Sequence, residues 1–368
     1  MKKPIYLLAA LIFSSSFSAS AQTPDTSMTF EEYNPQSTLV VPGEQVKSAR
    51  FPFVDVHNHQ WRMADSDLSA IAAEMDSLNM KVMVNLSGRS GEQLKAMVDA
   101  AEKQAPGRFI VFANIDFDGI DEPDWTERAV NQLVEDYTNG AKGVKIFKNL
   151  GLSVLDSEGN RVQTDDPRID PVWAKAGELG MPVLIHTGEP AEFWKPIDEK
   201  NERWLEMKNF PDRHRGDTTR FPSWEVVMAE QWNVFRKHPE TTFINAHMGW
   251  MANDLEKLGR HLDEFPNVYT EIGAILAELG RQPRFAKEWF IKYQDRVMFG
   301  KDTWRPEEYY VYFRVLESSD EYSDYYRKRH AFWKMYGLDL PDEVLQKLYY
   351  KNALRVIPGI DRSLFPEK

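Results

Sequence analysis

The sequence predicts an α/β protein folded as one closed (β/α)8 barrel, and two observations support this class. Short apolar runs alternate with amphipathic stretches along most of the 368 residues, and eight such units follow one another. Hydrophobic residues make up 42% of the chain and charged residues 28%, so the chain can bury a large core. An open doubly wound sheet is the alternative that the same alternation allows.

The apolar runs are the expected strands, and the stretches between them are the expected helices. The predicted strands cover residues 53–57, 81–86, 109–116, 143–147, 182–186, 242–247, 267–271 and 296–299. The stretches between them have helical periodicity, with Gly or Pro at several ends. The predicted helices cover residues 67–78, 91–103, 126–137, 171–179, 224–237, 254–264 and 283–293. A barrel with this alternation builds its working face at the carboxyl ends of the strands.

Two connections are longer than simple barrel turns. Residues 187–223 follow the fifth predicted strand and hold several aromatic residues among arginines, and residues 304–341 follow the eighth and are rich in tyrosine. Long loops of this kind are often functional, so both are candidate lids. For any single aromatic residue in them, packing against the barrel is the favoured interpretation.

The amino terminus has the pattern of a secretory signal peptide, expected to cover residues 1–21. Lys2 and Lys3 precede an apolar run over residues 5–13, and small residues end at Ala21. This run is about half the length that a membrane helix needs. Residues 22–50 are polar and read as a leader, and residues 51–368 form the expected barrel. We therefore expect a secreted or periplasmic protein that is free of the membrane after cleavage, with the exact cleavage site left open.

Composition excludes several kinds of chemistry. The chain contains no cysteine, so disulfides, iron–sulfur clusters and thiol nucleophiles are absent. The net charge is −12, and no basic run is long enough to follow a phosphate backbone, so nucleic acid is not an expected partner. We expect a small-molecule substrate, and either a monomer or a homodimer is compatible with the sequence.

The central motif lies on the first predicted strand. Alternation along a strand puts Asp55, His57 and His59 on the same side. The two histidines are about 7 Å apart along the backbone, so their side chains can converge on one metal ion. Asp55 lies one step deeper and can support the site from behind. A His-x-His pair alone is weak evidence, because such spacings also occur by chance.

Three further residues occupy the same position on other strands. His186 ends the fifth predicted strand, His247 ends the sixth, and Asp302 follows the eighth. Singly, each has an ordinary structural interpretation, since a lone histidine often packs and Asp302 can cap a turn. Together they gather where a barrel collects its catalytic groups. The remaining histidines at 214, 238, 261 and 330 are expected on the surface.

These motifs resemble the metal-dependent amidohydrolase superfamily over residues 53–357. The closest resemblance is to the branch that includes aminocarboxymuconate-semialdehyde decarboxylase, and the segments Phe-Gly-Lys-Asp302 and Lys351-Asn-Ala also match that branch. The resemblance implies a TIM barrel with His57, His59, His186 and Asp302 as metal ligands. It places His247 beside the metal, as a group that polarises the substrate or handles a proton.

Imidazole and carboxylate ligands suit a borderline divalent ion, so zinc is favoured and manganese is the alternative. An ion with an open position lowers the pKa of bound water toward about 7. Asp302 can take the proton as water attacks a carbonyl, while His247 and the metal stabilise the oxyanion.

Three basic residues are candidates for substrate binding. Lys145 lies within the fourth predicted strand, where a charge needs a partner. Some superfamily members carboxylate a lysine on this strand to bridge two metals, but the branch resembled here mostly uses one, so a non-ligand Lys145 and a single ion are favoured. Arg62 and Arg89 follow the first and second strands, where they can hold a substrate carboxylate or simply lie on the surface.

The first hypothesis is a secreted metal-dependent hydrolase that attacks an ester, lactone or amide of a small acidic molecule. The alternative is a non-oxidative decarboxylase, because the same ligands can bind and protonate a carboxylated substrate. A third hypothesis is a binding protein that keeps the metal without turnover. It would be expected to lack Asp302 or His247, and the sequence has both.

Overall fold

The computed structural model of the chain describes residues 26–40, 46–327 and 333–366. The chain separates into two units, Met1–Val40 and Val41–Lys368. Residues 26–40 contain no helix or strand and are exposed. The expected signal peptide at residues 1–21 lies outside the described residues, as does His330. Among the helices of the described segments, none has the length and apolar character needed to span a bilayer.

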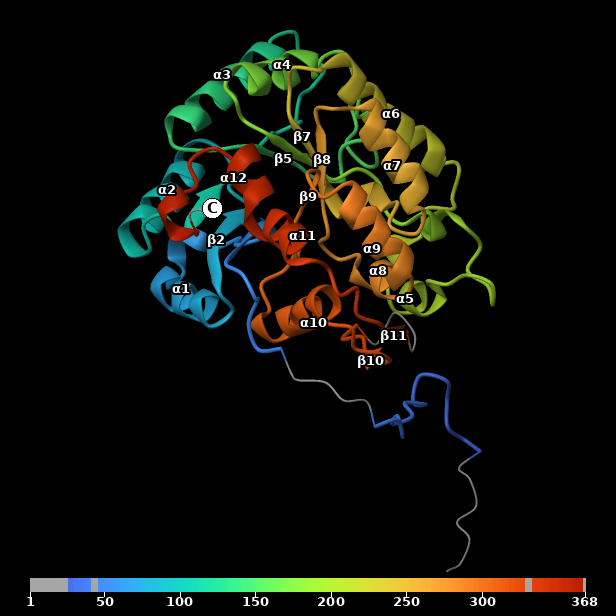
Figure 1. Cartoon of the computed structure of the whole chain (residues 1–368). Helices are drawn as coiled ribbons and strands as arrows, with labels where there is room; N and C mark the ends of the chain where they lie inside the picture. Colours follow the sequence, from blue (N-terminus) through green and yellow to red (C-terminus); the bar gives the residue numbers. More distant parts are fainter. Residues whose placement is uncertain (1–25, 41–45, 328–332, 367–368) are drawn as a thin grey trace, which may run out of the picture. The chain divides into compact units, whose positions relative to one another are not determined.

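The second unit is built around a closed parallel barrel (Figure 1). Its strands are β1 (Phe53–Asn58), β2 (Met80–Asn85), β3 (Phe109–Val111), β4 (Ala113–Asn114), β5 (Val144–Ile146), β6 (Val183–Ile185), β7 (Phe243–Asn245), β8 (Val268–Glu271) and β9 (Val297–Met298). Only Phe112 separates β3 from β4, so these two segments form one interrupted barrel strand. The Val56 amide donates to the Phe299 carbonyl over 2.9 Å and closes the barrel between β1 and the end of β9. The predicted barrel is therefore confirmed.

Helices surround the strands, and they lie where the sequence predicts them (Figure 1). They are α1 (Leu68–Ser77), α2 (Gly91–Gln104), α3 (Trp125–Thr138), α4 (Asp170–Glu178), α6 (Trp224–Lys237), α7 (Leu255–Glu264) and α9 (Pro283–Lys292). The side chains of Asp67, Ser223 and Asp254 accept hydrogen bonds at the starts of α1, α6 and α7. Toward the carboxyl terminus lie α11 (Asp342–Gln346) and α12 (Asn352–Val356), and α12 packs near β9.

The two long connections contain structure that the periodicity did not reveal. Residues 187–223 include α5 (Trp204–Asn209), and residues 304–341 include α10 (Pro306–Glu317) and a small hairpin of β10 (Ser323–Asp324) and β11 (Lys334–Met335). A short helix, α8 (Leu276–Gly280), also follows β8. Tyr309 and Tyr312 of α10 are fully buried, as the packing interpretation expects.

An aromatic cluster fixes the first and last strands together. The Phe53 ring of β1 lies 4.9 Å from Phe299 after β9, and 5.5 Å from Phe313 of α10. Tyr349 completes the cluster at 5.8 Å from Phe53. Because His57 follows Phe53 and Asp302 follows Phe299, this packing sets the distance between two polar side chains from opposite ends of the barrel sequence.

Two of the histidines expected on the surface are packed instead. The His238 side chain is 11% exposed and lies 3.0 Å from the Asp170 carboxylate. The His261 ring stacks on Trp232, with centroids 3.9 Å apart. Both residues are half-buried. His238 keeps a polar contact with Asp170, whereas His261 Nδ1 has no hydrogen-bond partner within the described residues. The surface prediction for these two histidines is therefore wrong.

Asp136 on α3 is a buried carboxylate outside the group of histidines, and its burial should make stability depend on pH. Its Oδ1 accepts from the Gly91 amide at 2.6 Å, and its Oδ2 has no hydrogen-bond partner within the described residues. Burial raises the pKa of Asp136 to about 6. The folded state therefore holds this proton more tightly than the unfolded state does, and stability should fall as pH rises from about 4 to about 6.

We expect Asp136→Asn to flatten this pH dependence and to raise the free energy of unfolding at pH 8 by on the order of 1 kcal/mol. Urea unfolding at pH 4.5 and pH 8 measures the change. Asp99→Asn, at a carboxylate that is 63% exposed on α2, is the control. An Asp136→Asn variant with the wild-type pH dependence would contradict the assignment.

Candidate active site

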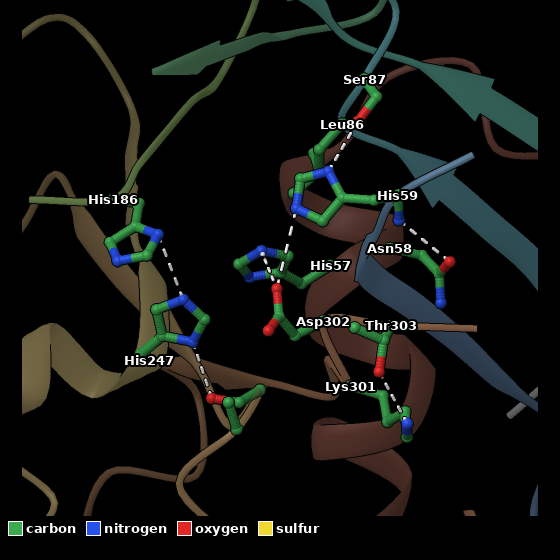
Figure 2. A network of polar contacts seen from close by, with 12 residues as sticks. His57, Asn58, His59, Leu86, Ser87, His186, His247, Lys301, Asp302 and Thr303 are labelled. Carbon is green, nitrogen blue, oxygen red and sulfur yellow. Dashed lines mark hydrogen bonds and ion pairs between the residues drawn. The ribbon is translucent and has the colours of Figure 1, made fainter. Parts of the chain in front are cut away.

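Four histidines and one aspartate from distant parts of the chain lie together at the carboxyl ends of the strands. His57 belongs to β1 and His59 follows it, His186 follows β6, His247 follows β7 and Asp302 follows β9. Figure 2 shows His186 and His247 on one side, His59 on the other, and His57 with Asp302 between them. The structure thus brings together every histidine and the aspartate that the sequence proposed for the site.

The distances between these side chains are short. Asp302 Oδ1 lies 3.3 Å from His57 Nε2 and 3.7 Å from His59 Nε2. His186 Nδ1 lies 3.3 Å from His247 Nε2. Within the described residues, one atom from each of His57, His247 and Asp302 forms a group with mutual distances below 4.8 Å. Such a group can hold a metal ion.

Hydrogen bonds on the far side of the rings decide which nitrogen of each histidine faces the site. His57 Nδ1 donates to Glu271 Oε1 at 2.9 Å, and His247 Nδ1 donates to the Gly273 carbonyl at 2.8 Å. Carboxylates and carbonyls only accept, so both Nδ1 atoms carry a proton. In the neutral rings, Nε2 then keeps its lone pair.

The same reasoning extends to His186 and His59. Because His247 Nε2 accepts, His186 Nδ1 is the donor of the bond between them, and His186 Nε2 keeps a lone pair. His59 Nδ1 lies 2.7 Å from Ser87 Oγ, which leaves its Nε2 directed at Asp302. Neither Ser87 nor its contact with His59 was predicted from the sequence.

Glu271 is the main residue that the sequence analysis missed. It is the last residue of β8, and besides His57 it accepts from the His247 amide at 2.6 Å and the Gly273 amide at 2.5 Å. Burial alone would raise its pKa, but the neighbouring His57 and the other donors lower the pKa of Glu271 to about 2. A carboxylate at the end of predicted strand 267–271 was the signal that could have identified it.

The imidazoles are held in the form that binds a metal ion. Burial, followed by the effect of nearby positive charge, lowers the pKa of His247 to about 4 and that of His59 to about 2. Burial also lowers the pKa of His186 well below its usual value. Asp302 behaves oppositely, since contact with His57 lowers its pKa despite burial. Burial opposes the charged form of His57, but Glu271 and Asp302 outweigh it and raise the pKa of His57. At neutral pH the site therefore presents neutral imidazoles at His59, His186 and His247 and a charged carboxylate, and a metal ion at His57 would displace the proton that these carboxylates favour.

The backbone is strained at two of these residues. His247 has φ 56° and Asp302 has φ 85°, a region that side chains other than glycine rarely adopt. Hydrogen bonds maintain both conformations, since the His247 amide donates to Glu271 and the Asp302 amide donates to the His57 carbonyl at 2.6 Å. Such strain tends to be kept where it positions functional side chains.

The structure explains why position 300, in the Phe-Gly-Lys-Asp segment, is a glycine. A Cβ at this position would lie 2.2 Å from Glu271 Oε2 and 2.9 Å from His57 Cβ. Only glycine lets the chain after β9 approach these two side chains so closely.

Asp55 supports the site through the backbone. It is fully buried, and its Oδ1 accepts from the amides of His57 and Lys301, both at 3.1 Å. Its Oδ2 accepts from Tyr309 at 2.6 Å and from Asn58. Asp55 thus ties the end of β1 to the turn that carries Asp302, and burial raises its pKa to about 6.

The donor set fits a bound divalent ion. The Nε2 atoms of His57 and His186 are buried and have no hydrogen-bond partner within the described residues. Buried polar atoms are normally satisfied, so two imidazole nitrogens that face the site without a donor fit the positions of ligands to a divalent cation. The distances between possible ligand atoms group His247 with His57 and Asp302. The hydrogen bonds give a different result, because His247 Nε2 already accepts from His186 Nδ1, whereas His186 Nε2 has no hydrogen-bond partner within the described residues. The hydrogen-bond pattern therefore favours His186 over His247 as a ligand.

The three basic candidates differ in their positions. Lys145 on β5 is buried, and its Nζ has no hydrogen-bond partner among the described residues. Burial lowers its pKa to about 7, while the charges of Asp302 and Glu271 oppose this shift. Arg89 is exposed, with its guanidinium 5.0 Å from the ring of Trp61, which stacks on His59. Arg62 is exposed, and no described residue pairs with its side chain.

Comparison with known proteins agrees with the barrel fold described above. A family model described as amidohydrolase matches residues 46–359. An uncharacterised TIM-barrel protein from Bordetella bronchiseptica has 16% identity and a TM-score of 0.51, over 83% of this chain and 98% of its own. A 2,6-dihydroxybenzoate decarboxylase bound to 2,6-dihydroxybenzoate has 14% identity and a TM-score of 0.50, over 83% of this chain and 99% of its own. These similarities support the barrel fold. No curated protein matched significantly in sequence.

Proposed function

The chain belongs to the amidohydrolase family, whose model matches residues 46–359, and on this basis we propose that it is a metal-dependent hydrolase of a small acidic molecule. Family membership makes the chain an enzyme of the hydrolase or lyase kind. The observation that carries the proposal is the pair of buried Nε2 atoms on His57 and His186, which have no hydrogen-bond partner in the described part of the chain and lie beside the Asp302 carboxylate.

His57, His59, His186 and Asp302 would hold the ion, and a single zinc ion suits this set of imidazoles and one carboxylate. When bound, a divalent ion lowers the pKa of a coordinated water and polarises a substrate carbonyl. Glu271, Gly273 and Ser87 keep the imidazole rings oriented, because each contacts the Nδ1 atom of one histidine.

Asp302 is the residue that would move the proton. Its low pKa keeps it ionised at neutral pH, and its side chain is 28% exposed toward solvent. It can accept a proton from attacking water at a carboxylate oxygen and return that proton to the leaving group.

Of the two roles expected for His247, proton handling is the one that its tautomer supports. A neutral ring whose Nδ1 donates to Gly273 has no proton on Nε2, so it cannot donate a hydrogen bond to an oxyanion. We therefore propose that His247 Nε2 accepts a proton or a hydrogen bond during the reaction. Lys145 Nζ is a buried donor without a hydrogen-bond partner among the described residues, and it would bind the acidic group of the substrate.

A decarboxylase on the same site is the second candidate. The buried Lys145 amine favours it as well, because its Nζ has no hydrogen-bond partner among the described residues and, when protonated, can hold the carboxylate that leaves as carbon dioxide. We further propose that residues 1–21 direct export to the periplasm or medium, on the sequence pattern described above.

Mass spectrometry separates the two reactions. The purified zinc-loaded chain is incubated with pooled acidic metabolites, including lactones and aromatic acids. Products heavier by one water support the hydrolase. Products lighter by one carbon dioxide would replace it with the decarboxylase, and pools that stay unchanged would favour a metal-binding protein without turnover.

Asp302→Asn should lower kcat by about 10³-fold, because the amide cannot accept the proton. Steady-state kinetics measure the effect, and a thermal melt checks the fold. Asp254→Asn, at the start of α7, serves as a control that alters an aspartate away from the site. An Asp302→Asn variant with kcat within a few-fold of wild type would remove Asp302 from the proton transfer.

A further inference from the structure

Arg327, in the second long connection just after β10, packs close to the turn that carries Asp302. Its guanidinium carbon lies 5.5 Å from the centroid of the Tyr326 ring. The Nζ atom of Lys301 lies 5.8 Å from the same centroid. Because Lys301 directly precedes Asp302, the Tyr326 ring connects Arg327 with the turn after β9.

A second set of contacts ties this segment to the turn after β8. The Tyr326 ring lies 6.4 Å from the Tyr312 ring, and the Tyr312 hydroxyl accepts from the Ala274 amide at 3.1 Å. Ala274 follows Gly273, whose carbonyl accepts from His247 Nδ1. Tyr326 therefore packs against groups on the turns after β8 and β9, at the same end of the barrel as the imidazoles.

The charge of Asp302 acts on Arg327. Burial opposes the charged form of the guanidinium, but the neighbouring tyrosine side chains and the Asp302 carboxylate outweigh it and raise the pKa of Arg327. Arg327 is nevertheless only half-buried, and the Asp302 side chain is 28% exposed, so a solute can reach both. Geometry and charge together place Arg327 at the margin of the active site.

Within the described residues, Arg327 has no acidic partner, in contrast to its neighbour Lys301. Lys301 Nζ pairs with Glu308 and donates to Thr303 Oγ1 at 2.9 Å. The Arg327 guanidinium instead contacts the Tyr326 ring, and no carboxylate of the described ranges forms an ion pair with it. A cation–π contact leaves the N–H donors in the guanidinium plane available, and two of them can bind one carboxylate.

Lys145 and Arg327 belong to opposite sides of the barrel mouth. Lys145 is on β5, whereas Arg327 contacts the turn after β9 through Tyr326. Counted around the closed barrel, with β3 and β4 as one strand, three strands separate β5 from β9 in either direction. One carboxylate would have to span the mouth to reach both cations, so they suit two separate acidic groups.

We propose that Arg327 is a substrate-binding residue that holds a second acidic group of the substrate, away from the reacting carbonyl. This assignment rests on the proposed function, in which Lys145 binds the first acidic group. It narrows the substrate to a diacid, or to an ester, amide or lactone derived from one. Once Asp302 is bound to an ion, its charge no longer compensates Arg327, and an anion of the substrate would do so instead.

Binding measurements test the assignment without turnover. The probes are butyrate, pentanoate and hexanoate, each compared with the diacid of the same length, which is succinate, glutarate or adipate. The zinc-loaded full chain, freed of unbound zinc, is titrated with each by calorimetry. At the chain length that spans the two cations, the diacid should bind about 10-fold more tightly than the monoacid. Since the added contact is an ion pair, this preference should shrink as the salt concentration rises.

Two substitutions separate the charge of Arg327 from its packing. Arg327→Gln removes the charge and should reduce the diacid preference to about 2-fold or less. Arg327→Lys keeps the charge but loses the paired donors, so it should give an intermediate preference. A purely structural role would change the binding of monoacid and diacid alike and leave their ratio unaltered. Arg260→Gln is the matched control, because it removes the same charge from a side chain that is 63% exposed on α7, and it should keep the wild-type preference.

The outcomes distinguish the Arg327 assignment from the proposed function. Equal binding of monoacid and diacid at every length, or no binding of any probe, would overturn the assignment. A diacid preference that Arg327→Gln leaves unchanged, or that Arg260→Gln reduces equally, would also overturn it. A preference that depends on Arg327 in a chain that hydrolyses nothing would support the assignment and remove the hydrolase.

Discussion

Replacing His57 with alanine is expected to abolish metal binding and to lower kcat/KM by at least about 10³-fold, the largest effect that we predict. Among the described residues, His57 Nε2 is one of two buried imidazole nitrogens at the barrel mouth that have no hydrogen-bond partner, and it lies 3.3 Å from Asp302 Oδ1. Its removal deletes a donor atom and also leaves Glu271 without the His57 N–H. Metal content by inductively coupled plasma mass spectrometry and steady-state kinetics measure the two losses.

A folding defect could imitate this result, since His57 is fully buried. Circular dichroism melts therefore accompany the measurements. His214→Ala is the control, because the His214 side chain lies in a half-buried loop away from the barrel mouth and contacts the Lys195 carbonyl. The control should retain both metal and activity. A folded His57→Ala variant with full metal content and wild-type turnover would refute the site as proposed.

Glu271→Gln is expected to weaken metal affinity by about 10- to 100-fold, although Glu271 need not touch the ion. The carboxylate accepts from His57 Nδ1 and from the amides of His247 and Gly273. A glutamine side chain has one accepting oxygen in place of two, so at least one of these donors loses its partner. Competition with a zinc chelator measures the affinity.

The same variant should cost about 3 kcal/mol of unfolding free energy at pH 7. The pKa of Glu271 lies near 2 in the folded chain, below its usual value of 4.5. Its contribution to stability is therefore fully present above pH 4.5 and is lost as pH falls toward 2. Urea unfolding should show a smaller difference between wild type and variant at pH 3 than at pH 7.

Glu317→Gln is the matched control for this pair of measurements. Glu317 is also a buried carboxylate, and it accepts from Tyr349 at 2.6 Å and from the Arg50 amide at 3.0 Å. Its substitution should reduce stability while leaving the affinity for zinc unchanged. If both variants weakened zinc binding equally, the effect of Glu271 would be a general loss of packing and not the orientation of His57.

The elements of the barrel could be predicted well because their signals are local. A strand such as β6, over Val183–Ile185, is a short apolar run, and a helix such as α3 has apolar residues at helical spacing. The helix α10 was missed, since its tyrosines were taken as part of a loop, yet Tyr309 and Tyr312 are buried. The hairpin of β10 and β11 was missed because its strands contain only two residues each.

The sequence alone determined that His57, His59, His186, His247 and Asp302 would share one end of the barrel. All parallel strands of a closed barrel point the same way, so residues that end different strands meet whatever their separation along the chain. Only the tertiary structure decided which ring nitrogens face the site, that Glu271 and Ser87 orient the rings, and that Trp250 stacks on His247. These features depend on contacts of about 3 Å between residues far apart in sequence, and side-chain packing, rather than strand order, sets such distances.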